Sequence, residues 1–179
     1  MSLNNVVAIA PDEQHRIWLS DADKGLYRWS SQKTDDFSKE PLLQGKSILT
    51  IREDSKGRVW FGFYEGGVAV FEEGVFRSYS ERDGLASGSI NAISVDDNGP
   101  VWIGAERGLT RFDGARFVTL NSTRGLPGER VFWIIPAHDD RSGSDTPPAS
   151  LASTGRSSIG LFTIRHTWLR MNSLTMGMA

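Results

Sequence analysis

A tryptophan recurs in this sequence with a constant period. Trp18, Trp60 and Trp102 follow one another at intervals of 42 residues, and each stands between two apolar residues. Upstream of each lies an aliphatic segment with an acidic turn, and downstream come a glycine, an aliphatic residue and an aromatic residue. A period of about 20–50 residues is typical of solenoids, propellers and repeat arrays, so it constrains the fold before any single element is assigned.

Within each copy, short segments of about 4–5 residues are rich in Val, Ile and aromatic residues and are separated by Gly or Asp turns. This pattern predicts four antiparallel strands per copy and no helix. Four such strands repeating at about 40–45 residues predict a β-propeller blade, with the tryptophan packed between neighbouring blades.

The turns before the tryptophans support this interpretation. The segments 54–57 and 96–99 begin with aspartate and end with glycine, at a position where a hairpin with a glycine bulge needs positive φ. The first copy has His15 at this position, so we expect backbone strain or a different turn geometry there.

The predicted fold class is all-β: a partial β-propeller of about three four-stranded antiparallel blades plus the first strand of a fourth, with an irregular C-terminal tail. Closed propellers have about 4–8 blades, so three cannot complete a ring. An open stack would leave a blade face uncovered, and we therefore expect marginal stability or association. Within a propeller domain at 1–135, the predicted boundaries are 4–46, 47–88 and 89–130 for the blades and 131–135 for the start of the fourth.

The remaining segment, 136–179, differs in composition. It contains no Asp or Glu from residue 146 onward, and three of the four Met residues fall near its end. This composition has two interpretations: a flexible linker leading to a short apolar end, or translation in a shifted reading frame.

Charge and composition exclude several partners. The 20 basic and 22 acidic residues give a net charge of −2. The chain therefore has no long-range positive field that would attract a nucleic acid or an anionic membrane. No run approaches the ~20 apolar residues of a membrane span, and the first ten residues lack signal-peptide features, so we expect no membrane insertion and, for the chain as written, a cytoplasmic or unknown location. Cysteine is absent, which removes disulfides and thiolate sites.

Candidates for catalysis or metal binding are weak. His15, His138 and His166 are scattered, and the pairs 53–54 and 96–97 recur at turns, where acidic residues form the turn itself. The 21–23 segment resembles a fragment of a calcium loop but lacks the remaining ligands. We predict no catalytic residue, no metal and no cofactor.

A binding surface is better sought in loops that vary between copies, because rigid blades hold such loops in place. The loops between the second and third strands share a face with the connections between blades. Arginines there would bind carboxylates or sulfates, and a tyrosine would offer a stacking face, although an ordinary solvated surface is the alternative. The candidate residues are Tyr64, Glu65, Arg82, Glu106, Arg107 and Arg124.

The repeat resembles that of the two-component regulator propeller family. Residues 90–112 follow the pattern of that repeat, including Trp-Ile-Gly and Gly-Leu-Thr-Arg-Phe, and the connections Arg-Asp-Gly-Leu at 82–85 and Arg-Gly-Leu-Pro at 124–127 are similar to the linker of the family. The resemblance covers roughly residues 4–135. It implies a periplasmic sensor propeller of a hybrid histidine kinase or related receptor, which binds a saccharide or another small polar ligand and contacts neighbouring blades or a second subunit.

Two alternatives stay open. The streptogramin lyases share the short blade and the Gly-x-aliphatic-Trp pattern, but they need a catalytic histidine, for which only His15 is available inside the repeat. The third reading is a truncated structural module with no independent function.

Overall fold

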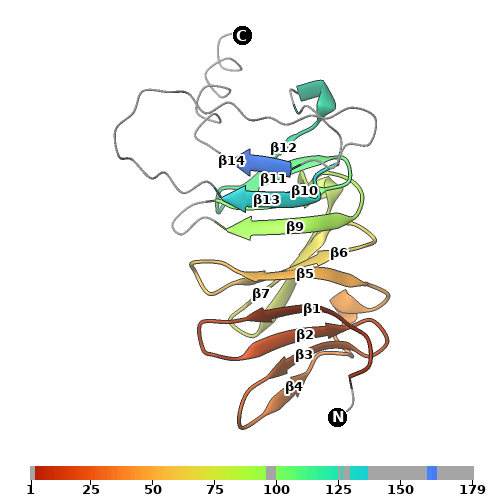
Figure 1. Ribbon diagram of the computed structural model, residues 1–179, viewed down its shortest axis with the longest axis vertical. Helices are drawn as coiled ribbons and strands as arrows, with labels where there is room; N and C mark the ends of the chain where they lie inside the picture. The colour runs from red at the N-terminus through yellow and green to blue at the C-terminus, as the bar shows by residue number, and fades with distance from the viewer. Residues whose placement is uncertain (1–2, 96–99, 125, 127–129, 137–160, 165–179) are drawn as a thin grey trace.

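The computed structural model (Figure 1) describes residues 3–95, 100–124, 126, 130–136 and 161–164. Three four-stranded antiparallel sheets follow one another along the chain, each with its strands in sequence order. The first sheet contains β1 (Val6–Pro11), β2 (Ile17–Asp21), β3 (Gly25–Trp29) and β4 (Thr34–Asp36). The second contains β5 (Ile48–Glu53), β6 (Val59–Phe63), β7 (Val68–Glu72) and β8 (Val75–Tyr79). The third contains β9 (Ile90–Val95), β10 (Val101–Ala105), β11 (Gly108–Phe112) and β12 (Phe117–Leu120).

These sheets, called blades 1, 2 and 3 below, confirm the predicted all-β class and the antiparallel blades. Short 3₁₀ turns lie in the connections that follow the blades: η1 (Pro41–Leu43), η2 (Glu81–Asp83) and η3 (Ser122–Arg124). The first strands β1, β5 and β9 lie side by side, and β13 (Trp133–Pro136) packs next to β9 as the expected start of a fourth blade (Figure 1). The blades therefore fan out from a common inner edge.

The three repeated tryptophans fill the spaces between blades, as predicted. Trp18 and Trp60 are fully buried and Trp102 nearly so. The ring of Trp18 lies 5.2 Å from those of Phe61 and Phe71 in blade 2, both in edge-on geometry. Aromatic contacts of this kind stabilise beyond simple burial of area.

The buried indoles of Trp18 and Trp60 each have a polar partner that the sequence did not reveal. Asp54 accepts hydrogen bonds from Trp60 Nε1 at 2.8 Å and from Arg58 Nε at 2.7 Å through Oδ2. Its Oδ1 accepts the backbone N–H groups of Lys56 and Arg58 at 3.0 and 3.1 Å. The same aspartate thus closes the β5–β6 turn and satisfies a buried donor in the next strand. Asp12 makes the equivalent bonds in blade 1.

The sequence predicted either backbone strain or a different turn geometry at His15, and the structure shows which of the two occurs. The N–H of His15 donates to the Asp12 carbonyl at 2.9 Å, as that of Gly57 does to the Asp54 carbonyl. His15 has φ +59° where Gly57 has φ +75°. The geometry is therefore shared, and histidine adopts the left-handed conformation that carries a steric cost for any residue with a Cβ.

The glycine of the Trp-x-Gly motif has a packing role. A Cβ on Gly62 would lie 2.6 Å from Cγ2 of Ile90 in the next blade, and one on Gly104 would lie 2.6 Å from Cγ1 of Val131. Blade 1 has Ser20 at this position, whose hydroxyl donates to the Ile48 carbonyl at 3.4 Å. The first strand of each following blade therefore approaches closely at this point.

Strand β4 completes the four strands predicted for blade 1, but it is short and polar, with the sequence Thr-Asp-Asp, so apolar periodicity did not indicate where it lies. Strand β14 (Leu161–Ile164) lies in the segment predicted to be irregular and pairs in parallel with β13. The rest of 137–179 is outside the described residues, and so is the 96–99 turn. In the part of the chain that is described, no helix has the length and apolar character needed to cross a membrane.

Candidate functional site

The loops of the blade stack lie on two opposite faces, because consecutive hairpins of an antiparallel sheet turn at opposite ends of its strands. The turns at 12–16 and 54–58 lie on one, the hairpin face. On the other, the connector face, each β2–β3 type loop is hydrogen-bonded to a connection between blades: Tyr64 N–H to the Ser47 carbonyl at 2.9 Å, and Glu106 N–H to the Ser89 carbonyl at 3.0 Å. The predicted loops and connections are therefore neighbours in space.

Tyr64 and Glu65 lie at the junction of blades 1 and 2 on the connector face. Tyr64 is 62% exposed and lines a cavity of about 290 Å³, together with Lys46 and Ser47. The carboxylate of Glu65 accepts the backbone N–H and the hydroxyl of Ser47, both at 2.9 Å. Burial alone would raise the pKa of Glu65, but these hydrogen bonds outweigh it and lower the pKa. The side chain of Glu65 is thus used to hold the loop in place. Of these two candidate residues, Tyr64 is the one whose side chain is available to contact a ligand.

The acidic residue of the next loop is also engaged within the chain. Glu106 Oε1 pairs with Arg130 Nη2 at 2.9 Å, and its Cβ lies where a side chain on Gly88 would have to go. Arg107 is exposed, with its backbone N–H bonded to the Ser87 carbonyl at 3.1 Å.

Of the two predicted arginines in the connections, Arg82 is exposed in η2, and Arg124 ends η3, with its side chain outside the described set. Within the described residues, no hydrogen bond or ion pair joins one of the six candidates to another. They mark positions along one face and do not form a single cluster.

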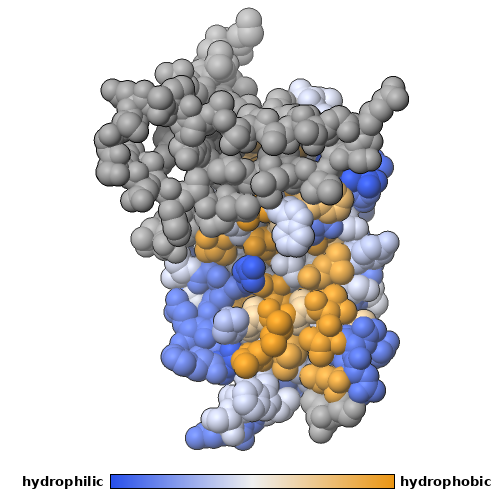
Figure 2. Space-filling model, viewed as in Figure 1, coloured by the Kyte–Doolittle hydropathy of each residue, from blue (hydrophilic) through white to orange (hydrophobic). Residues whose placement is uncertain are grey.

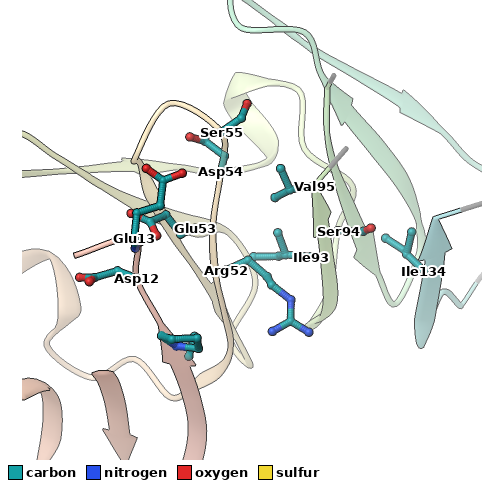
Figure 3. Close-up of a pocket in the computed structure, with 12 residues that line it drawn as sticks. Asp12, Glu13, Arg52, Glu53, Asp54, Ser55, Ile93, Ser94, Val95 and Ile134 are labelled. Atoms are coloured by element: carbon teal, nitrogen blue, oxygen red, sulfur yellow. Dashed lines mark hydrogen bonds between the residues drawn. The ribbon is translucent and has the colours of Figure 1, made fainter. Parts of the chain in front are cut away.

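A larger cavity lies along the inner edge of the fan and was not predicted. It has a volume of about 720 Å³ and is lined by the first strands of all three blades and by Ile134 of β13 (Figure 3). Because strands about 40 residues apart in sequence contribute to it, a molecule bound there would touch every blade. Its polar lining is Asp12, Glu13, Arg52, Glu53, Asp54, Ser55 and Ser94.

These polar groups divide into engaged and available ones. Asp12 and Asp54 are held by the turns described above, whereas Arg52 is exposed, and its Nη1 makes only a long 3.4 Å bond to the carbonyl of Ile51. Figure 3 shows the guanidinium of Arg52 extending in a different direction from the carboxylates of Glu13 and Glu53. The cavity thus offers a cation in one region and acidic groups in another.

Glu53 couples blades 1 and 2 at this cavity. Its Oε2 accepts the backbone N–H of Glu13 at 2.6 Å. Burial raises the pKa of Glu53, with a further contribution from the neighbouring charges of Asp12 and Glu13, and the hydrogen bond from Glu13 opposes this rise. Among the described residues, no group of three or more potential metal ligands occurs.

The sequence does contain a feature that points to this cavity, namely one strand position whose residue type varies between the three copies. Ala10, Arg52 and Ser94 occupy the same place in the three copies, at intervals of 42 residues, and their chemistry changes while their neighbours repeat. The candidate residues predicted from the sequence all lie in loops and connections, on the other side of the blade stack from this variable strand position. Which of these positions borders an open cavity is decided by the stacking of the blades.

The fold and the repeat define a segment of a β-propeller. The family model for the two component regulator propeller matches residues 42–65, which span the connection into blade 2 and its first hairpin. Residues 42–65 thus match the two-component regulator propeller repeat that the motifs of the sequence resemble. A search of curated proteins finds no match.

Solved structures share the fold at low sequence identity. The extracellular domain of a protein described as a hybrid two component system from B. thetaiotaomicron is 24% identical, with a TM-score of 0.63, over 73% of this chain and 19% of that one. A second extracellular domain from the same organism, described as belonging to a one component system, is 22% identical with a TM-score of 0.54, over 71% and 16%. Virginiamycin B lyase from Staphylococcus aureus is 13% identical with a TM-score of 0.57, over 72% and 43%. The chain therefore spans about a fifth of the length of the first of these proteins.

Proposed function

We propose that this chain is part of the ligand-sensing propeller of a two-component signalling receptor, located in the periplasm, and that it does not act as an enzyme. The ligand proposed is a saccharide or another small polar molecule. The observation that carries this proposal is the inner-edge cavity. Its lining combines an available arginine, four acidic side chains, of which Asp12 and Asp54 are held by their turns, and hydroxyl groups from blades 2 and 3.

The arrangement of the cavity suggests how binding would be transmitted. Glu53 already links blade 2 to the Glu13 backbone of blade 1 through one hydrogen bond. A ligand that also engages Arg52 and Ser94 would add bonds between blades 2 and 3. Binding would then change the free energy of blade stacking, and that change is what a receptor can pass to its output domain.

The Tyr64 surface is the second candidate for ligand contact. Its exposed ring beside a 290 Å³ cavity suits stacking on a sugar, with Arg82, Arg107 and Arg124 as further polar contacts on the same face. The two surfaces lie on different parts of the blade stack, so single substitutions distinguish them.

The experiment compares binding of galacturonate and galactose by calorimetry. If the inner-edge cavity is the site, galacturonate binds more tightly because Arg52 pairs with its carboxylate, and Arg52→Ala weakens it about tenfold, consistent with the loss of one charge-assisted hydrogen bond. Arg77→Ala, on the exposed face of β8, is the matched control and leaves binding unchanged. Loss of binding in Tyr64→Ala or Arg107→Ala instead would move the site to the connector face. Absence of binding to either sugar would contradict the saccharide proposal.

An enzymatic role resembling that of the lyases has less support in the described residues. His15 is their one histidine, and it occupies the tight turn of the first hairpin with φ +59°. No polar partner is positioned beside its ring among the hydrogen bonds of that turn. Incubation with a streptogramin B antibiotic, followed by mass spectrometry, would reveal a ring-opened product if the lyase reading were correct.

A further inference from the structure

The cavity beside Tyr64, called the connector-face cavity below, differs from the inner-edge cavity in the chemistry of its lining. Its large apolar lining residues are Val7, Leu26, Phe37, Leu43, Ile48 and Leu49. Leu26, Leu43 and Ile48 are at most 8% exposed, whereas Val7 is 45% exposed. The cavity thus has an apolar inner wall that continues to the surface.

Two of these apolar side chains are placed by β-bulges. The pairing of β1 with β2 shifts register at Val7, and the pairing of β5 with β6 shifts register at Leu49. A bulge turns a side chain out of the regular alternation, and bulges are frequent beside binding sites. Figure 2 shows apolar surface gathered over the inner strands of the lower blades, to which both bulges belong, with hydrophilic side chains on either side.

Most polar groups of the lining are already hydrogen-bonded within the chain. Asp21 is 1% exposed, and its carboxylate accepts four backbone N–H groups. Ser20 donates to a backbone carbonyl of blade 2 at 3.4 Å, and Ser38 and Ser47 are each hydrogen-bonded to a carboxylate of the chain. A sugar placed deep in this cavity would leave several of its hydroxyl groups without partners, which costs free energy.

Two polar groups of the lining are available, the ammonium group of Lys46 and the hydroxyl of Tyr64. Both side chains are exposed, and neither forms an ion pair or a side-chain hydrogen bond with another described residue. The Lys46 ammonium lies 5.8 Å from the centre of the Phe63 ring. The connector-face cavity therefore presents one cation and one neutral hydroxyl beside an apolar wall.

We propose that the connector-face cavity binds a small aromatic carboxylate. The ring would lie against the apolar wall and Tyr64, and the carboxylate would pair with Lys46. The volume of about 290 Å³ is at the lower end of the range of about 300–1,000 Å³ typical of ligand sites, which suits a single ring. The inference does not rest on the saccharide proposal, because the two cavities share no lining residue.

The first test compares benzoate with benzamide, its neutral analogue of nearly the same shape. Each is titrated into the isotopically labelled chain, and the backbone amides are followed by nuclear magnetic resonance. Benzoate should shift the amides of residues 46–49 and 64–66 in a saturable way. It should bind about tenfold more tightly than benzamide, the effect of one charge-assisted hydrogen bond.

The second test uses single substitutions. Lys46→Gln should abolish the preference for benzoate, so that both compounds bind alike, whereas Tyr64→Ala should weaken both. Lys39→Gln removes the charge of an exposed lysine outside the lining and is the matched control, which should keep the tenfold preference. Arg52→Ala, which tests the inner-edge cavity, should leave benzoate binding unchanged, so the two proposals fail independently.

Four results would overturn the proposal. The first is equal affinity of the unchanged chain for benzoate and benzamide, and the second is no saturable shift of the named amides with benzoate up to about 10 mM. The third is a preference for benzoate that survives in Lys46→Gln. The fourth is galacturonate shifting the same amides at lower concentration than benzoate, which would make this cavity a saccharide site.

Discussion

Replacing Asp54 by alanine should lower the free energy of unfolding strongly, although the change in side-chain volume is small. In Asp54→Ala, four hydrogen bonds lose their acceptor. Trp60 is fully buried, so its indole N–H would be left without a partner, which costs about 1–3 kcal/mol. The side chain of Arg58 is 13% exposed and would keep its charge over the Trp60 ring without the carboxylate beside it.

Breaking a largely buried ion pair by removing one partner costs about 3–5 kcal/mol. The cost of breaking the ion pair and the cost of leaving the indole N–H unpaired are not additive, because Arg58 and Trp60 donate to the same Oδ2 atom of Asp54. We therefore expect Asp54→Ala to lower the free energy of unfolding by about 3–5 kcal/mol, a large part of the about 5–15 kcal/mol typical of a domain.

The assay is urea unfolding followed by circular dichroism, with the midpoint and the slope fitted separately. Asp113→Ala is the matched control, because Asp113 accepts two backbone N–H groups and one arginine in an exposed turn but binds no indole. Its loss should cost only about 1 kcal/mol. Equal effects of the two substitutions, or a loss below about 1 kcal/mol for Asp54→Ala, would refute the role assigned to the buried indole bond.

Three further predictions concern packing, backbone strain and pH. Gly62→Ala should destabilise the chain by about 1–3 kcal/mol in the same urea assay, because the new methyl group would lie 2.6 Å from Cγ2 of Ile90; an unchanged midpoint would show that the blades can move apart freely. His15→Gly should raise the free energy of unfolding by about 0.5–1 kcal/mol by relieving the φ of +59°, and a loss of stability would mean that the imidazole makes a favourable contact that outweighs the strain. The pKa of Asp35 is lowered by its hydrogen bond from Lys33, followed by that from Arg28, so between the folded and unfolded pKa values the unfolded chain binds more protons. Stability from Asp35 is therefore present above the ordinary value of 3.8 and is lost as the pH falls through the lower folded value; Asp35→Asn should flatten this part of a thermal-melting profile recorded against pH, and an unchanged acid slope would contradict it.

Much of the fold could be predicted because a blade is a local object. Its strands are joined by short turns, and the alternation of apolar residues, the aspartates that open turns and the glycines with positive φ all act within about ten residues of one another. The strand around Trp60 and the turn at Gly57 were predictable for this reason. Strand β4 was not, because Thr-Asp-Asp is held in place by its pairing with β3 and not by burial of its own side chains.

The candidate site was less predictable. The sequence indicated correctly that loops and connections meet on one face, but it could not show that Glu65 and Glu106 are already occupied by Ser47 and Arg130. Those contacts are side-chain bonds across 18 residues or more, and many partners of similar chemistry were available in the sequence.

The sequence by itself determined the 42-residue rhythm, the four-stranded blades and the burial of three tryptophans, since each follows from local hydrophobic pattern and turn chemistry. The tertiary structure alone decided that Arg52 and Glu53 border one cavity and that Ile9 is uncovered while its counterpart Ile51 is buried. The physical reason is that these properties depend on which blade lies beside which, and a repeat encodes each blade in the same way whether or not it has a neighbour.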